Sequence, residues 1–225
     1  MNDKISILLP TRNRSRMLME RAIPTVLGQT HQNWELLIVG DCCTDDTEEV
    51  VRSFNDPRIR FFNLPEKIYH YPKDDAKTEW LAGPVFALNK ALDMVTGDYI
   101  ARIDDDDYWL EQHLERSLDF ISIGYDFVSA NAAVIVDGIV KVLPPYQEPT
   151  CGSVQTWLYS AMYKEVKYDP DCWQKKIDRN NEIDLYKRIS RWARFGHLDE
   201  IHAIILPRPG LTTIGSKAYL EERNV

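Results

Sequence analysis

The chain has 225 residues, of which 44% are hydrophobic and 28% are charged, and its formal net charge is -8. This length fits one large α/β domain or a small domain built from two halves, and the negative charge excludes a general affinity for nucleic acid or anionic membranes. No stretch approaches the roughly 18 to 20 apolar residues of a membrane span, and the polar start is unlike a signal peptide. We therefore expect a cytoplasmic protein without a transmembrane segment. Its four cysteines show no CxxC metal spacing and are expected to be reduced thiols.

The first half of the chain alternates strand and helix patterns. Short apolar runs predict strands at 5–9, 34–39, 58–62 and 99–103. Helical patterns lie between them at 15–26, where Pro24 weakens the middle, from Thr44 as the cap to a stop at Pro57, and at 84–95, ending at Gly97. A charged and aromatic loop is expected at 65–79. Repeated β-α-β units with buried strands predict a mostly parallel sheet with helices on both faces.

The second half has a different pattern. A helix is expected at 110–123, followed by a strand at 127–136 that turns at Asp137 and Gly138 into a returning strand at 139–143. Helical patterns then lie at 153–164 and 182–195, before a last strand at 201–206. These elements predict a smaller, mixed region that is joined to the first half without a linker.

Four consecutive aspartates, residues 104–107, directly follow the fourth predicted strand. A strand that ends in carboxylates places them at its C-terminal edge, where open α/β sheets bind ligands. Magnesium or manganese held by one or two carboxylates plus substrate phosphates is a common use of such an edge. The run thus predicts a metal-diphosphate site. The alternative is a solvated acidic loop in which Asp107 caps the next helix.

Four motifs in order along the chain carry a family resemblance. They are Pro10-Thr-Arg-Asn-Arg14, Gln29-Thr-His-Gln-Asn-Trp-Glu35, Gly40-Asp-Cys-Cys-Thr-Asp-Asp-Thr47 and Ile103-Asp-Asp-Asp-Asp-Tyr-Trp109. Their order and spacing closely resemble those of the family 2 glycosyltransferases. The resemblance implies a GT-A fold, with a mostly parallel Rossmann-like sheet flanked by helices and a smaller mixed acceptor-side sheet. It also implies a nucleotide-sugar half at 1–107, an acceptor half at 108–215 and a tail at 216–225.

The resemblance assigns roles to residues at the first two strand ends. Asp41 would accept a hydrogen bond from the base of the nucleotide, and Pro10 and Thr11 would line the base and ribose. Arg12 stands where the family often has tyrosine, and its guanidinium would stack on the base or pair with phosphate. Asn89 fits the family's Arg-Asn helix and is placed with the donor-binding residues. The alternative for Asp41 is a residue that caps the following turn.

The chain departs from the family pattern beside Asp41. Gly40 stands where the family often has an acid, and Cys42 and Cys43 replace Gly-Ser, which we interpret as small half-buried residues. Three lysines in the loop after the third strand, Lys67, Lys73 and Lys77, are each either surface residues or a phosphate contact.

The aspartates of the run are expected to have different roles, depending on their positions. Asp104 and Asp106 match the family's Asp-x-Asp, so Asp106 is expected to bind Mn2+ or Mg2+ directly and Asp104 to contact ribose or metal. Asp105 lies between them in the expected donor site, and the sequence gives no partner for its charge.

An inverting transfer also needs a carboxylate that removes the acceptor hydroxyl proton. The segment from Asn180 to Arg188 resembles the helix that carries this base, and in register Glu182 occupies the position of the catalytic aspartate. Because residues i and i+2 face different sides of a helix, Asp184 is expected to brace Arg188 or cap the turn. The alternative for Glu182 is a first-turn acid that complements the helix dipole.

Together these residues predict transfer of a sugar from a nucleotide-diphosphate donor, a UDP-sugar, to a hydroxyl acceptor with inversion. The acceptor would be a glycan, a lipid-linked molecule or another hydroxyl compound, and it could bring the protein to a membrane surface. Near the end, Pro207 to Thr213 resembles a loop that closes over the diphosphate, and Arg208 either supplies a cation there or lies on the surface. A non-catalytic nucleotide- or glycan-binding module is one alternative. A sugar-1-phosphate nucleotidyltransferase is another, although residues 10–14 lack the glycines of its phosphate loop.

Overall fold

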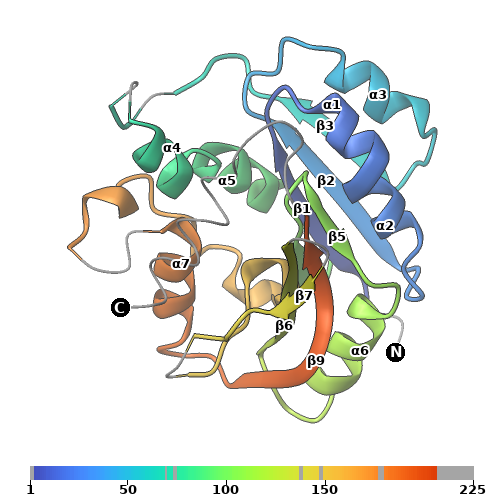
Figure 1. The fold of residues 1–225 in the computed structure, drawn as a ribbon, viewed down its shortest axis with the longest axis vertical. Helices are drawn as coiled ribbons and strands as arrows, with labels where there is room; N and C mark the ends of the chain where they lie inside the picture. Colours follow the sequence, from blue (N-terminus) through green and yellow to red (C-terminus); the bar gives the residue numbers. More distant parts are fainter. Residues whose placement is uncertain are drawn as a thin grey trace.

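The computed structural model describes residues 3–68, 70–72, 75–136, 139–146, 149–176 and 180–206 (Figure 1). Nine strands form one continuous sheet in the order β3-β2-β1-β4-β8-β6-β9-β5, with β7 paired to β6. The strands are β1 (Ile5–Thr11), β2 (Trp34–Gly40), β3 (Ile59–Asn63), β4 (Tyr99–Arg102), β5 (Asp107–Trp109), β6 (Phe127–Val136), β7 (Ile139–Val142), β8 (Leu158–Ser160) and β9 (Phe195–Ile205). The first four strands in this order are parallel, as the sequence predicts.

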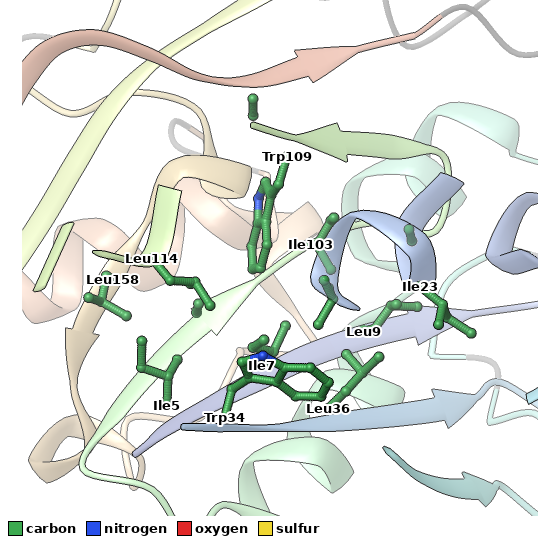
Figure 2. Packing of buried hydrophobic residues seen from close by; sticks show 14 of the residues in the cluster. Ile5, Ile7, Leu9, Ile23, Trp34, Leu36, Ile103, Trp109, Leu114 and Leu158 are labelled. Carbon is green, nitrogen blue, oxygen red and sulfur yellow. The ribbon is translucent and has the colours of Figure 1, made fainter. Parts of the chain in front are cut away.

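Helices cover both faces of the sheet, which also agrees with the prediction. They are α1 (Ser15–Met17), α2 (Ile23–Leu27), α3 (Thr47–Ser53), α4 (Ala76–Ala82), α5 (Val85–Met94), α6 (His113–Ile121) and α7 (Asn181–Ile189). Strand residues alternate between the two faces, so that Ile7 packs with the α2 and α6 side and Leu8 packs with the α5 and α7 side. Figure 2 shows the first of these cores, in which Trp34 and Trp109 lie among aliphatic side chains. No helix among the described residues is long and apolar enough to cross a membrane.

Three helix starts differ from the predictions. Thr44 does not cap α3, because the Asp45 carboxylate accepts the hydrogen bond from the Thr47 main-chain nitrogen at 3.2 Å. The predicted loop at 65–79 already contains the beginning of α4, which Asp75 caps. The helix expected from residue 110 starts only at His113, because residues 107–109 form β5. In each case a local side-chain or strand contact sets the boundary.

The segment around Pro24 remains helical. A π-helical turn at Leu18–Ala22 separates α1 from α2, and Pro24 falls in the first turn of α2. Pro24 has no N–H to donate to the preceding turn, and the π-helical turn directly before α2 accommodates it. The sequence therefore identifies the right position for an irregularity, and the π-turn is its form.

The helix predicted at 153–164 is wrong. This segment contains β8 between two single 3-10 turns, and β8 pairs antiparallel with both β4 and β6. Tyr159 pairs with Phe127 across the sheet and stacks on its ring with centroids 5.4 Å apart. Tertiary pairing overrides the helical spacing of the aromatic residues here. Likewise, the predicted helix at 182–195 ends at Ile189, and β9 begins at Phe195.

Two buried histidines contact each other next to Trp109 of β5. The Nδ1 atoms of His113 on α6 and His202 on β9 are 3.1 Å apart, and both side chains are buried. Burial lowers the pKa of both rings, and the pKa of His113 falls well below its ordinary value. The pair is therefore held neutral in the folded protein.

We expect this pair to make the protein less stable in mild acid. The unfolded chain binds protons below about pH 6.5, whereas the folded pair resists them, so the free energy of unfolding falls as the pH drops through that value. Burial raises the pKa of Asp105 to about 6, which acts with the opposite sign in the same range. The measurement is therefore a comparison of urea unfolding at pH 7.5 and 5.5 for the wild type and His113→Phe. An equal pH dependence in the two proteins would contradict this account.

Candidate functional site

Three parallel strands end side by side at one edge of the sheet. Thr11 at the end of β1 pairs with Gly40 at the end of β2, and the Asp41 main-chain nitrogen donates to the Thr11 carbonyl at 2.8 Å. β4 lies on the other side of β1 and leads directly into the aspartates. The structure thus brings Pro10, Thr11, Asp41 and the aspartate run to a single sheet edge, as the strand pattern predicts.

Arginines of the chain itself neutralise much of the aspartate run. Arg102 contacts Asp104 Oδ1 through Nε at 3.0 Å and Nη2 at 2.9 Å. Arg14 Nη1 lies 2.7 Å from Asp105 Oδ1 and 3.7 Å from Asp106 Oδ2. Arg21 donates to the Asp106 carbonyl at 3.0 Å. Cations of the chain itself therefore pair with three of the four carboxylates, those of Asp104, Asp105 and Asp106.

Asp105 points into the protein. Its side chain accepts hydrogen bonds from Thr11 Oγ1 at 2.7 Å and from Arg14 at 2.7 Å, and the residue is 2% exposed. Burial, together with the charge of Asp106, raises the pKa of Asp105 to about 6, although Arg14 opposes the shift. Both oxygens are engaged internally by Thr11 and Arg14, whereas the sequence places Asp105 with the donor-binding residues.

Asp107 is not a helix cap. It begins β5 and pairs with Ile205, whereas the residue before α6 is Gln112. The side chain is buried, and burial together with Asp106 and Asp104 raises the pKa of Asp107 well above its ordinary value. The fourth aspartate is therefore a buried residue at the start of β5, the last strand in the sheet order.

Cations and carboxylates alternate around Asp41. Lys67 Nζ lies 3.7 Å from Asp41 Oδ2 and 2.9 Å from Glu79 Oε1, and Arg12 Nη1 is 3.4 Å from the same Glu79 oxygen. Asp41 is 8% exposed, and burial raises its pKa. Of the three lysines considered from the sequence, Lys67 is placed at this edge by its contacts with Asp41 and Glu79. Lys77 is on α4, and Lys73 lies outside the described residues.

Gly40 has no room for the acid that the family often carries there. A Cβ atom at this position would lie 2.6 Å from Asn63 Oδ1. Asn63 is held by two hydrogen bonds, from the Cys43 main-chain nitrogen at 2.8 Å and to the Cys43 carbonyl at 2.9 Å. The turn that carries Asp41 is thus fixed by an asparagine, and the glycine makes that contact possible.

Replacing Gly40 with alanine is expected to lower the free energy of unfolding by about 1–2 kcal/mol, because Asn63 would lose both hydrogen bonds. Gly28→Ala is the matched control. Its Cβ would meet the nearest atom at 3.4 Å, an ordinary contact, so we expect a change below about 0.5 kcal/mol. Urea unfolding of the three proteins measures both effects, and equal losses in the two variants would show that the turn tolerates a side chain.

Asn89 is bonded to the main chain of Tyr168. Its amide nitrogen donates to the Tyr168 carbonyl at 2.9 Å, and its amide oxygen accepts from the Tyr168 nitrogen at 2.8 Å. These contacts join α5 to the segment after β8. We therefore place Asn89 among the residues that hold the site together. Arg208 and the loop at 207–213 lie outside the described residues.

Glu182 lies in the first turn of α7 and is 8% exposed. Asn180 caps this helix by accepting from the Glu182 main-chain nitrogen at 2.9 Å, and its amide donates to Glu182 Oε1 at 3.3 Å. The side-chain amide of Asn180 therefore holds both the backbone and the carboxylate of Glu182.

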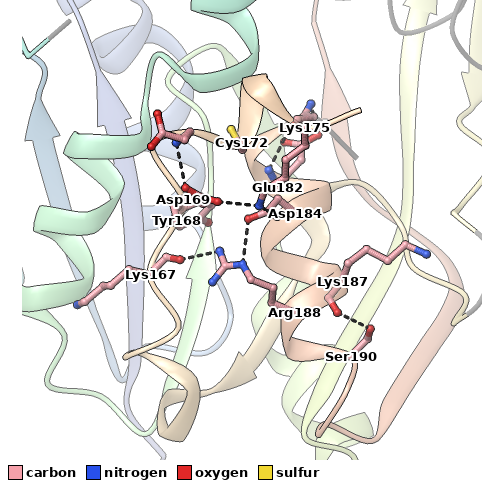
Figure 3. A network of polar contacts seen from close by, with 12 residues as sticks. Lys167, Tyr168, Asp169, Cys172, Lys175, Glu182, Asp184, Lys187, Arg188 and Ser190 are labelled. Atoms are coloured by element: carbon pink, nitrogen blue, oxygen red, sulfur yellow. Dashed lines mark hydrogen bonds and ion pairs between the residues drawn. The ribbon is translucent and has the colours of Figure 1, made fainter. Parts of the chain in front are cut away.

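Asp184 pairs with Arg188, as predicted. It forms ion pairs with Lys175 and with Arg188, whose Nε lies 2.9 Å away, and Figure 3 shows it between these two cations. Arg188 also donates to the Lys167 carbonyl at 2.6 Å, and Lys175 pairs with Asp169 at 2.7 Å. Asp184 thus braces Arg188 and the segment before α7.

The donor set at the sheet edge fits a divalent cation. Among the described residues there is no group of three or more His, Cys, Asp or Glu side chains that could hold a metal ion by themselves. Mg2+ and Mn2+ prefer oxygen ligands, and Mg2+ is usually bound through one or two carboxylates plus substrate phosphates. Asp104 and Asp106 can supply two such carboxylates.

The arginines of this site were not predicted from the sequence. An acidic run needs cations near it, whether from a metal or from the chain. That argument points to Arg102, which stands two residues before Asp104. It does not point to Arg14, which lies 91 residues before Asp105. Glu79 carries no comparable signal in the sequence.

The sequence pattern of glycosyl transferase family 2 matches residues 6–70 and 77–199. The chain belongs to this family. Among curated members, the putative teichuronic acid biosynthesis glycosyltransferase TuaG of Bacillus subtilis is 34% identical over 119 residues, which are 52% of this chain and 41% of TuaG. WfgD of Escherichia coli, described as a UDP-Glc:alpha-D-GlcNAc-diphosphoundecaprenol beta-1,3-glucosyltransferase, is 30% identical over 138 residues, which are 58% of this chain and 49% of WfgD.

Solved structures show that the fold of this family 2 chain is GT-A. Staphylococcus aureus TarS in complex with UDP superimposes with a TM-score of 0.69 at 18% identity, over 92% of this chain and 61% of that one. The mannosyltransferase PcManGT of Pyrobaculum calidifontis, solved with GDP-Man and Mn2+, gives 0.63 at 14% identity, over 97% and 60%. The chain spans less than half the length of the two curated relatives.

Proposed function

We propose that this family 2 domain transfers a sugar from a UDP-sugar to a hydroxyl acceptor, with inversion and with a divalent cation. The observation that carries the proposal is the meeting of Asp41, Asp104 and Asp106 at one sheet edge, with Arg102 joining Asp104 to the helix of Glu182. The complexes of two fold neighbours with UDP and with GDP-Man and Mn2+ support a nucleotide-sugar donor and a metal.

Each group would act by its position. Thr11 and Asp41 would hold the nucleoside, and Asp106 and Asp104 would hold Mg2+ or Mn2+. The cation, when bound, would offset the charge of the leaving diphosphate. Glu182 would accept the proton of the acceptor hydroxyl as its oxygen attacks the anomeric carbon. The anomeric bond to the diphosphate oxygen breaks as the new glycosidic bond forms on the opposite face.

A panel of nucleoside diphosphates tests the donor. With Mn2+ or Mg2+ present, UDP is expected to raise the melting temperature more than GDP or ADP, because ligands that bind only the folded state stabilise it. No shift with any of the three would overturn the proposal. A shift without any release of UDP from a panel of UDP-sugars would instead favour a non-catalytic binding module.

A lipid-linked acceptor is proposed from the curated relatives. WfgD is named for an acceptor on diphosphoundecaprenol, and a Campylobacter jejuni relative is named for a related carrier. An acceptor of this kind would bring the domain to a membrane surface. Transfer of labelled sugar to a short-chain polyprenyl diphosphate sugar, compared with a free sugar, distinguishes the two acceptor classes.

A further inference from the structure

Arg102 is a fully buried guanidinium at the end of β4. Its side chain is 4% exposed, and it follows Ile100 on the sheet face that packs against α5 and α7. Burying a charge in such a place is costly unless it is paired and hydrogen-bonded. An aliphatic side chain would fill the position without that cost, so the charge calls for a functional explanation.

The contacts of Arg102 lead in two directions. On one side, Nε and Nη2 bind Asp104 Oδ1. On the other side, Nη1 donates to Asn181 Oδ1 at 3.1 Å, and the guanidinium carbon lies 5.7 Å from the centre of the Tyr168 ring. Nε, Nη2 and Nη1 of the planar guanidinium thus each have a partner. Arginine can make such a set of contacts, and lysine cannot.

Asn181 connects Arg102 to α7, the helix that carries the expected base Glu182. Its amide nitrogen donates to the Leu81 carbonyl at 2.8 Å, which fixes the amide oxygen toward Arg102. Asn181 is the first residue of α7, and Glu182 is the second. The metal-side carboxylate and the first turn of α7 are therefore joined through one side chain.

We propose that Arg102 is a positioning residue that ties Asp104 to the first turn of α7 and so holds Glu182 in place. This inference rests on the proposed function, because Asp104 and Glu182 have their roles from it. Arg102 itself touches neither the donor nor the acceptor in this scheme. It acts by fixing the two carboxylates that do.

The charges around Glu182 support this role. Although burial opposes its charge, Asp104, Tyr168 and Glu182 raise the pKa of Arg102, so the cation persists throughout the working range. Among the described residues, Arg102 on β4, Tyr168 after β8 and Cys151 after β7 interact electrostatically with Glu182. Burial raises the pKa of Tyr168 and of Cys151, which keeps both neutral. Arg102 is thus the charged partner among these three groups.

A carboxyl titration tests the inference without any substrate. The protein is labelled with 13C at the glutamate side-chain carboxyls, and the resonance of Glu182 is identified by its loss in Glu182→Gln. In Arg102→Met the titration midpoint of this resonance is expected to rise by about one pH unit, because a neighbouring cation has been removed. In Arg14→Met, which removes a cation at the same sheet edge that is paired with Asp105, the midpoint is expected to stay at its wild-type value.

Two milder variants test the positioning role and cover a folding failure of Arg102→Met. Asn181→Ala keeps the Arg102–Asp104 pair and breaks the link to α7, so kcat for UDP release from a UDP-sugar is expected to fall about tenfold or more at unchanged UDP affinity. Arg102→Lys keeps the charge but loses the planar guanidinium, so it should keep the midpoint of Glu182 and share the loss in kcat.

The outcomes separate the inference from the function on which it rests. An unchanged Glu182 midpoint in Arg102→Met, or a wild-type kcat in Asn181→Ala and Arg102→Lys, would overturn the inference. A wild-type protein that neither binds UDP with Mn2+ nor releases it from any UDP-sugar would overturn the proposed function. The midpoint shift would still be measured in that case and would then report on the charge coupling alone.

Discussion

Asp106→Ala is expected to abolish the stabilisation by UDP and Mn2+ and to slow sugar transfer by about 100-fold or more. The carboxylate is the proposed direct metal ligand, and it lies 3.7 Å from Arg14, which keeps its closer partner Asp105 at 2.7 Å. The apo protein should therefore lose little stability. Thermal melts with and without Mn2+ and UDP measure both effects.

Asp105→Ala is the matched control in the same run. It removes the acceptor for Thr11 Oγ1 and the nearest carboxylate of Arg14, so we expect the apo protein to lose about 2–3 kcal/mol of unfolding free energy. Asp106→Ala would then lose the stabilisation by UDP and Mn2+, whereas Asp105→Ala would lose stability of the apo protein. If Asp106→Ala binds UDP with the metal dependence of the wild type, the metal assignment is wrong.

Glu182→Gln is expected to lower the rate of UDP release or transfer by about 10²- to 10⁴-fold while leaving UDP affinity unchanged, because it removes the proton acceptor and keeps the shape. The alternative is that Glu182 only complements the dipole of α7. In that case the variant would lose about 0.5 kcal/mol of stability and would keep its rate. Steady-state kinetics and isothermal titration with UDP decide between the two.

Asp184→Asn, two residues away, serves as the control for the base assignment. It leaves Lys175 and Arg188 without their shared carboxylate. Since both cations are about one third exposed, we expect a loss of about 1–2 kcal/mol of unfolding free energy with most of the catalytic rate retained. A variant that is stable but inactive would move the base from Glu182 to Asp184.

The meeting of three strand ends at one edge of the sheet was predictable, because the end of a strand and the side chains that follow it are local features of the sequence. Apolar runs at 5–9, 34–39 and 99–103 end directly before Pro10, Gly40 and Asp104, so their convergence follows from parallel pairing alone. The ion pair between Asp184 and Arg188 also followed from helix spacing. These inferences needed no knowledge of distant contacts.

The predictions were wrong where contacts between residues far apart in the sequence determine the local structure. Asp107 looked like a helix cap, but pairing with Ile205, almost 100 residues later, draws it into a strand. Tyr159 fitted a helical spacing of aromatic residues, but Leu158–Ser160 forms β8, which pairs with β4 and β6. The charge of Asp105 had no partner in the sequence because Thr11 and Arg14 reach it from the first motif. Sequence separation was the common cause.

The single sheet limits how this domain can respond to its substrates. β8 is hydrogen-bonded to β4 on one side and to β6 on the other, so the strands that end at the nucleotide edge and those of the second half share one backbone ladder. A hinge between the halves would have to break that ladder. Opening and closing around a donor therefore falls to segments between the strands, and substrate-dependent changes in amide exchange should be confined to them while the strands stay protected.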